Sequence, residues 1–275
     1  MEHNVSILII TCSLYENIWE PFFKCLKNKW PDNKYKIYIG CDKYVDKSKY
    51  PGKNFIITNI EPYSSNYNNR VKDFLKQIKT KYVLLFQDDL LITSQIKTND
   101  IINCLNVLEK NKEYNGIRLH SIGADSGKGN KIFKLHNNKF LRNMSYNQKY
   151  WFSWMVTLWN REKLSIILDN LKKDTSAEDC EIELTKIMKK KNKSMLSIGS
   201  GKSNIIDYMG IGAINGGIVN NKYMEYLKKE NVPIKVYDNN CIYDKNNPNL
   251  HKYNKTDNYY MKNQNRLIKK SIKYK

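Results

Sequence analysis

Blocks of apolar residues with two different periods alternate along the first 120 residues of the chain. Short runs rich in β-branched and aromatic residues predict strands, at 5–11, 35–40, 54–60, 82–86 and 116–122. Runs with apolar side chains three and four positions apart predict helices, at 16–29, 67–80 and 101–108. Strands that alternate with helices are typical of an α/β fold, in which a mostly parallel sheet carries helices on both faces.

The pattern is looser in the second half of the chain. Residues 123–147 favour loops and a short hairpin, and residues 151–159 are aromatic and apolar. Helices are expected at 161–171 and 176–190, and a strand at 195–198.

Composition changes again near residue 245, after which Lys, Asn and Tyr dominate and aliphatic residues are few. We therefore predict one domain at 1–245, with a first half at 1–122 and a second at 123–245, followed by a basic extension at 246–275.

The strand predicted at 82–86 is followed directly by Gln87, Asp88 and Asp89. In open α/β sheets, ligands bind at the carboxyl ends of the strands. Neighbouring carboxylates there suit Mg²⁺ or Mn²⁺, which in turn suits a diphosphate. The alternative interpretation is a surface turn in which the two acids cap the next helix, but the chain continues as Leu90-Leu91-Ile92, without a turn residue.

The chain is strongly basic, with 47 Lys and Arg against 27 Asp and Glu and a formal net charge of +20. This charge predicts an anionic partner, such as a nucleotide diphosphate or an anionic membrane surface that the protein contacts peripherally. The lysines are spread along the whole chain and form no compact nucleic-acid-binding signature, so no specific nucleic-acid partner is expected.

The six cysteines are scattered and form no close pair typical of a zinc or redox motif. The apolar run at 5–10 is too short for a secretory signal and fits a strand. We therefore expect reduced thiols and a protein that is cytoplasmic or acts at the cytoplasmic face of a membrane.

Several of these segments together resemble the GT-A type glycosyltransferases, in particular family 2-like enzymes that use nucleotide sugars. The resemblance covers roughly residues 5–220. The segments that carry it are Thr11 to Tyr15 after the first strand, residues 16–23, Trp30-Pro31, Asn69-Arg70 at a helix start, and Phe86 to Asp89. It implies a GT-A (Rossmann-like) sheet whose first half binds the nucleotide sugar, a UDP-sugar being favoured, and whose second half binds the acceptor. The acceptor would be a glycan, a protein or a lipid-linked sugar.

In the resembled family, the strand-end acids form a D-x-D motif that holds Mn²⁺ or Mg²⁺ against the donor diphosphate. Here Gln87 replaces the first acid. The resemblance therefore implies that Asp89 is the main metal ligand, and that Asp88 is a second ligand or a contact to the donor. This departure also leaves open whether the metal is strictly required.

The resemblance implies that further donor contacts come from the ends of the first two strands and from one helix start. They are Thr11, Cys12, Ser13, Tyr15, Asp42 and Arg70, beside Gln87 and Asp88. Arg70 would add positive charge near the diphosphate. The alternatives are a solvated helix-start arginine for Arg70, a surface aromatic for Tyr15 and a turn residue for Asp42.

Inverting transferases need a carboxylate that takes the proton of the acceptor hydroxyl. The resemblance places this base in an acidic segment that opens a helix, which here makes Asp179 the first choice, with Glu178 beside it and Glu181 as an alternative. The competing interpretation is structural, because Ser176 and Asp179 have the spacing of a capping box.

Trp151 and His120 are the candidate acceptor contacts, because an aromatic ring can stack on a sugar and His120 lies at a predicted strand end. The alternatives are a core tryptophan and a half-buried histidine. Two other functions stay open. One is a nucleotidyltransferase on a related fold, and the other is a basic nucleic-acid- or membrane-binding protein without catalysis.

Overall fold

The computed structural model describes residues 4–12, 15–42, 57–60, 67–121, 131–135, 139–144, 150–171, 176–191, 194–199, 204–209, 214–215, 218–219 and 221–232. Two compact units make up the chain, Met1–Ile211 and Gly212–Lys275. Ser13 and the predicted extension at 246–275 lie outside the described residues.

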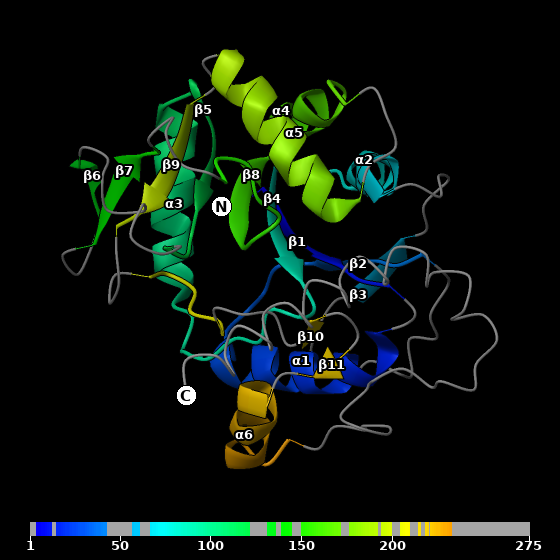
Figure 1. Ribbon diagram of the computed structural model, residues 1–275. Helices are drawn as coiled ribbons and strands as arrows, with labels where there is room; N and C mark the ends of the chain where they lie inside the picture. The colour runs from blue at the N-terminus through cyan, green and yellow to red at the C-terminus, as the bar shows by residue number, and fades with distance from the viewer. Residues whose placement is uncertain are drawn as a thin grey trace, which may run out of the picture. The chain divides into compact units, whose positions relative to one another are not determined.

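A nine-stranded sheet forms the centre of the first unit (Figure 1). Its strands are β1 (Val5–Ile10), β2 (Ile37–Gly40), β3 (Ile57–Ile60), β4 (Tyr82–Gln87), β5 (Tyr114–Arg118), β6 (Lys131–Lys134), β7 (Phe140–Asn143), β8 (Thr157–Asn160) and β9 (Ser194–Ile198). Their order across the sheet is β3-β2-β1-β4-β8-β5-β9-β7-β6.

The sheet has a parallel core and mixed flanks. β1 pairs in parallel with both β2 and β4, and β3 extends the parallel set beyond β2. β8 pairs antiparallel with β4 and β5, and β7 pairs antiparallel with β9 and β6. All described strands of this sheet except β7 and β8 therefore run in one direction, which confirms the predicted α/β fold with a mostly parallel sheet.

Helices cover both faces of the sheet, as predicted. On one face α2 (Tyr67–Gln77), α4 (Arg161–Leu168) and α5 (Ala177–Lys190) pack over a core that includes Leu8, Leu85 and Trp159 (Figure 1). The other face carries α1 (Glu16–Lys29) and α3 (Thr98–Lys110), with the Phe22 ring of α1 against Phe86 of β4. The β1 and β4 side chains point to the two faces in turn, and every residue of β1 is buried.

The strand β8 was not predicted as an element, although its residues were recognised as aromatic and apolar. Its four residues are too few to establish a period of two, and it runs against its neighbours. The hairpin of β6 and β7 confirms the one expected within 123–147. The predicted helix at 67–80 ends at Gln77, and the predicted strand at 116–122 is β5, which ends at Arg118.

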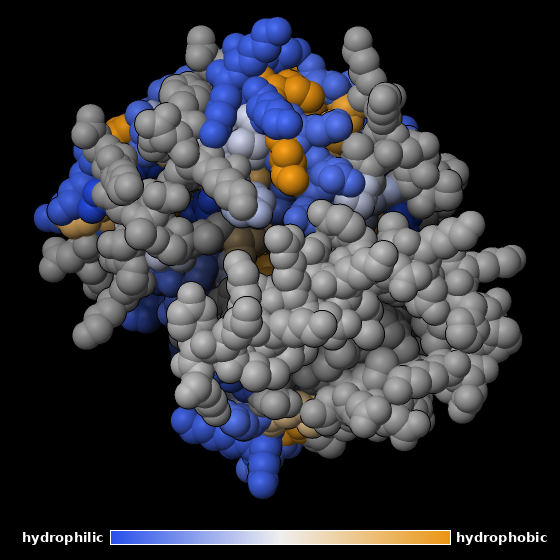
Figure 2. All heavy atoms as spheres, viewed as in Figure 1, coloured by the Kyte–Doolittle hydropathy of each residue, from blue (hydrophilic) through white to orange (hydrophobic). Residues whose placement is uncertain are grey.

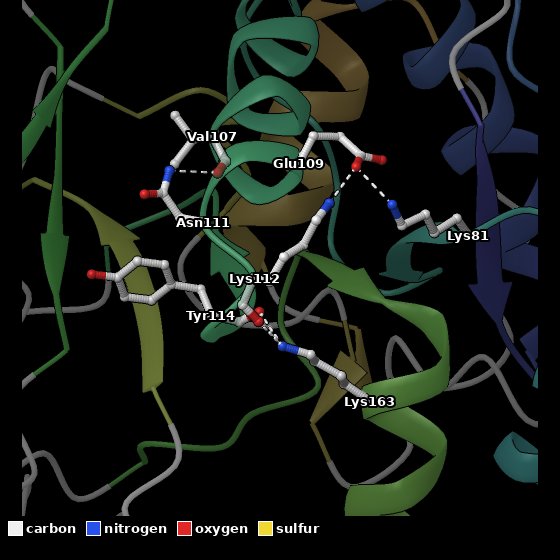
Figure 3. A network of polar contacts seen from close by, with 7 residues as sticks. All are labelled: Lys81, Val107, Glu109, Asn111, Lys112, Tyr114 and Lys163. Carbon is white, nitrogen blue, oxygen red and sulfur yellow. Dashed lines mark hydrogen bonds and ion pairs between the residues drawn. The ribbon is translucent and has the colours of Figure 1, made fainter.

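A polar network closes the amino-terminal edge of the sheet, where β4 and β5 begin (Figure 3). Glu109 of α3 accepts hydrogen bonds from Lys81 at 2.6 Å and from Lys112 at 2.5 Å. Lys163 of α4 donates to the carbonyl oxygen of Tyr114 at 3.1 Å and to that of Lys112. The network joins α3 and α4 to the starts of β4 and β5. Protein side chains therefore occupy this part of the amino-terminal edge.

The outer surface of α4 and α5 is largely hydrophilic, with apolar side chains among the charged ones (Figure 2). Ile166 of α4 is 53% exposed, one of two exposed large hydrophobic residues in the described part of the chain. None of the helices in the described ranges has both the length and the apolar character needed to cross a bilayer.

The described residues of the second unit form a two-stranded antiparallel sheet and a helix. The strands are β10 (Ile214–Asn215) and β11 (Ile218–Val219), and they are followed by α6 (Asn221–Lys229). This helix was not predicted from the sequence.

We expect Gly116→Ala to lower the free energy of unfolding by about 1–3 kcal/mol, because a Cβ at this position would lie 2.7 Å from the carbonyl oxygen of Leu158 in the neighbouring strand. Urea denaturation measures the change. Gly199→Ala is the control, since its Cβ would meet the Arg142 side chain at 3.3 Å. Equal stability of the Gly116 variant and the native protein would contradict the close packing of β5 on β8.

Candidate functional site

The segments that follow β4 and β5 meet a stretch of irregular chain at 204–209. Ile92 and Tyr208 form an antiparallel bridge, and the Thr93 N–H donates to the carbonyl oxygen of Asp207 at 2.9 Å. The Ile205 N–H donates to the carbonyl oxygen of Leu119 at 3.0 Å. These bonds tie the stretch to the segments that follow β4 and β5, so that it borders the edge at which ligands bind in α/β sheets.

Asp88 is buried at 3% exposure and points to the face that α1 covers. Its Oδ2 accepts a hydrogen bond from Trp19 Nε1 at 3.0 Å and another from the Thr11 hydroxyl. Burial, followed by the charge of Asp89, raises the pKa of Asp88 well above its usual range. The carboxyl group therefore joins β4 to β1 and α1.

Asp89, the next residue, lies in the turn after β4 and near Tyr208. Burial raises its pKa to about 6. Its Oδ1 is buried and has no hydrogen-bond partner among the described residues. A buried carboxylate oxygen without a donor is costly unless another group, such as a cation or a hydroxyl, reaches it. Asp89 is thus the strand-end acid that is available to a ligand.

Glu181 is the second acid of the site, and it is half-buried in the second turn of α5. Its Oε1 accepts from the backbone N–H of Trp154 at 2.6 Å and from the Ser153 hydroxyl at 2.9 Å, and neither bond uses Oε2. Burial raises the pKa of Glu181, while these two donors and the Arg118 charge oppose the rise. One oxygen is therefore fixed, and the carboxyl group holds its proton more tightly than an ordinary glutamate does.

Two tyrosines and Arg118 surround the two acids. Tyr67, at the start of α2, accepts a hydrogen bond from Gln87 at 3.4 Å, and its ring packs edge-on against Trp154. Burial raises the pKa of both Tyr67 and Tyr208, so both phenols are neutral at pH 7. Arg118 is 4% exposed, and desolvation lowers its pKa to about 10, which leaves it charged at neutral pH.

The predicted donor contacts gather around the ends of β1 and β4, with one exception at β2. Thr11 binds Asp88, Gln87 binds Tyr67, and Arg70 lies 5.8 Å from the Tyr67 ring centre. Cys12 follows β1, and its carbonyl accepts from the Tyr15 backbone at 2.9 Å. Asp42 lies after β2, two strands from β4, and its carboxylate accepts from the Cys41 thiol at 3.2 Å.

The three predicted bases differ in their surroundings. Glu178 and Asp179 are exposed in the first turn of α5. The Ser176 hydroxyl accepts from the Asp179 N–H at 3.1 Å, which is the N-cap bond of a capping box, and it also donates to the Asp179 carboxylate at 2.8 Å. The capping interpretation of Asp179 thus describes its contacts. Of the three acids, Glu181 is the one held within the site.

The two predicted acceptor contacts are less accessible than the sequence suggested. Trp151 is 1% exposed and belongs to the core under α4 and α5, which leaves its ring no surface for a sugar in this conformation. His120 is half-buried, its ring lies 4.0 Å from that of Tyr208, and its Nδ1 is 3.1 Å from the carbonyl oxygen of Ile206.

Sequence reasoning missed four residues of the site, namely Trp19, Tyr67, Arg118 and Tyr208. Trp19 and Arg118 lie within elements whose apolar pattern suggests only packing. Tyr67 and Tyr208 belong to a chain rich in tyrosine, in which no single tyrosine stands out. A charged residue within a buried strand was the one signal that could have identified Arg118.

The residues present fit a divalent cation at Asp89. Its unpartnered oxygen is the hard ligand that Mg²⁺ and Mn²⁺ prefer. Across the described ranges, no group of three or more His, Cys, Asp and Glu side chains is placed to hold a metal ion. A cation at Asp89 would therefore take most of its ligands from a phosphate-bearing substrate and from water.

No protein-family profile matches the chain, and no curated protein matches its sequence. Among solved structures, a CMP:2-keto-3-deoxy-manno-octonic acid synthetase complexed with CTP is similar with a TM-score of 0.46 and 9% identity, covering 82% of this chain and 97% of that one.

Two further solved structures are similar in the same range. TarS from S. aureus, residues 1–349, gives a TM-score of 0.44 at 15% identity, covering 72% of this chain and 58% of that one. The bifunctional IspDF from Campylobacter jejuni gives 0.41 at 14% identity, covering 73% and 50%. These likenesses assign no residue role and no substrate, and the α/β fold stands on the strand order and register given above.

Glu181→Gln is expected to keep the stability of the protein at pH 4, below the pKa of an unfolded glutamate, and to raise it at pH 8. The amide oxygen can accept both existing hydrogen bonds, and the cost of burying a charge is removed. In the native protein the unfolded state ionises first as pH rises, because the folded pKa is raised, so native stability falls relative to the variant. Urea unfolding of both proteins across pH 4–8 measures the difference.

Glu181→Ala provides the contrast in this series. It leaves the Trp154 N–H and the Ser153 hydroxyl without their acceptor, and it should be about 1–3 kcal/mol less stable than Glu181→Gln at every pH. If the alanine and glutamine variants were equally stable, the two hydrogen bonds would contribute nothing.

Proposed function

We propose that this protein is a glycosyltransferase that moves a sugar from a nucleotide-sugar donor to a hydroxyl of an acceptor. The observation that carries the proposal is the pair of half-buried acids in different surroundings near one edge of the sheet. Asp89 has an oxygen without a partner, and Glu181 has one oxygen fixed by two donors. Two acids set apart in this way suit two tasks, metal binding and proton transfer.

The donor side of the proposed site is the end of β4 with the start of α2. Asp89 would hold Mn²⁺ or Mg²⁺, and the bound ion would supply Lewis-acid stabilisation of the charge that grows on the departing diphosphate. Arg70, near Tyr67, would add a positive charge on the same side. A UDP-sugar is the favoured donor, as the resemblance to GT-A enzymes implies.

On the acceptor side we assign the general base to Glu181 in preference to Asp179. The oxygen of the acceptor hydroxyl forms a bond to the anomeric carbon, and the bond from that carbon to the diphosphate oxygen breaks. The hydroxyl proton passes to Oε2 of Glu181. A raised pKa makes the carboxylate a better proton acceptor near neutral pH, and this single displacement inverts the configuration of the sugar.

The acceptor in this proposal is a glycan, a protein or a lipid-linked sugar. A lipid-linked acceptor would bring the enzyme to a membrane surface, to which a net charge of +20 would be attracted if the lipids are anionic.

UDP together with Mn²⁺ is expected to raise the melting temperature, because a ligand that binds only the folded state stabilises it by about 2.7 kcal/mol at roughly one hundred times its Kd. The shift should disappear in Asp89→Asn and persist in Glu113→Gln, a control at an exposed acid just before β5. GDP, CMP and ATP complete the panel. Absence of a shift with every nucleotide would remove the donor site from the proposal.

Glu181→Gln should lower the rate of sugar transfer by about 10²–10⁴-fold while leaving the UDP shift intact, because it removes the proton acceptor and keeps the hydrogen bonds. Asp179→Asn should lose less than about threefold, since its carboxylate accepts from the hydroxyl of the N-cap residue Ser176 and faces solvent. Release of nucleoside diphosphate from the nucleotide sugar measures the rate. Release of pyrophosphate from a nucleoside triphosphate and a sugar phosphate would instead identify a nucleotidyltransferase.

A further inference from the structure

The segment 150–154 has no regular secondary structure, yet each of its residues is bonded by one of three side chains. Arg118 of β5 donates through one terminal nitrogen to the carbonyl oxygens of Tyr150 at 2.8 Å and Trp151 at 3.2 Å. Thr185 of α5 accepts from the Phe152 N–H at 3.0 Å. The next two residues are held by Glu181, through the Ser153 hydroxyl and the Trp154 N–H.

These three side chains act on the segment from two directions. Glu181 and Thr185 lie one helical turn apart on the same face of α5. Arg118 reaches the segment from the sheet. The position of the two donors that fix Oε1 of Glu181 therefore depends on the carbonyl groups that Arg118 holds immediately upstream.

Arg118 is costly to bury, and its surroundings offer little compensation. It is 4% exposed, its Nε has no hydrogen-bond partner, and it forms no ion pair within 4.0 Å in the described part of the chain. A methionine of similar length would fill the same space without desolvating a charge. Packing alone thus gives no reason for an arginine here.

Arg118 also differs in charge from the other titratable groups near Glu181. The titratable groups are Tyr67 from α2, Tyr208 from the stretch 204–209, Glu178 from α5 itself, and Arg118 from β5. Both tyrosines are neutral at pH 7, and Glu178 adds a like charge. Among these described groups, Arg118 alone favours the ionised form of Glu181.

We propose that Arg118 is a positioning residue for Glu181. It holds the segment 150–154 so that two donors fix Oε1, and it keeps the carboxyl group able to ionise, which leaves Oε2 to receive a proton. The consequence for catalysis rests on the proposed function, but the positioning itself concerns this chain alone and needs no substrate to be measured.

The test compares Arg118→Met with Arg161→Met. Arg161, at the start of α4, is a matched control because its guanidinium also donates to two backbone carbonyls, those of Thr80 at 2.8 Å and Leu75 at 3.4 Å. Those carbonyls lie at the amino-terminal edge of the sheet. Arg161 is half-buried, and any general effect of losing an arginine that binds two backbone carbonyls should appear in both variants.

Two nuclear magnetic resonance signals report the outcome without substrate. In Arg118→Met the carboxyl pKa of Glu181 should rise further, because a positive charge has been removed, and the Trp154 amide proton should move upfield as its hydrogen bond weakens. Glu181→Gln assigns the carboxyl signal. Arg161→Met should leave both signals as in the native protein. Unchanged signals in a folded Arg118→Met variant would overturn the proposal.

Arg118→Lys keeps the charge and tests the geometry separately. It should preserve most of the Glu181 pKa but shift the Trp154 amide signal, since one ammonium group does not reproduce the guanidinium contact to two carbonyls. If Arg118→Met does not fold, Arg118→Lys tests the proposal by itself. A Trp154 amide signal unchanged from the native protein in Arg118→Lys would refute the positioning role.

An activity readout separates this proposal from the proposed function. If transferase activity is found, Arg118→Met should lower it roughly 10- to 100-fold at acidic pH, with the acidic limb of the pH profile moved to higher pH. If no activity is found but the two signals respond as described, the positioning stands and the assigned reaction does not.

Discussion

The bond that Trp19 and Thr11 make to Asp88 determines how the proposed site is arranged. A strand sends consecutive side chains to opposite faces, and Gln87 and Asp88 follow this rule, one meeting Tyr67 and the other Trp19. Asp88 is therefore occupied by donors from β1 and α1, while the next acid, Asp89, lies in the turn near Tyr208 and keeps a carboxyl oxygen without a partner among the described residues.

Much of the fold could be predicted from the sequence, because the parallel core consists of buried strands with clear apolar runs. The acidic end of β4 was also predictable, since two acids after such a run have few structural explanations. β8 could not be predicted, because its four residues are recognised as a strand only once β4 and β5 are present on both sides. Local patterns carry no information about such neighbours.

The choice between Asp179 and Glu181 shows the same limit within one helix. The sequence shows three acids near the start of α5, and local physics assigns the first turn to capping, as the contacts of Ser176 and Asp179 illustrate. What distinguishes Glu181 is an irregular segment some thirty residues upstream that packs against the second turn. Because this segment is distant in the sequence, the contact cannot be predicted from the helix sequence alone.

The insertion of β8 between β4 and β5 has a consequence for how the chain is made. During synthesis the edge of β4 has no partner until residues 157–160 leave the ribosome, although β5 is completed about forty residues earlier. An apolar strand with an open edge invites pairing with another nascent chain. Fragments that end before β8 should therefore aggregate. A chaperone would protect the open edge of β4 most while the residues between β5 and β8 are being synthesised.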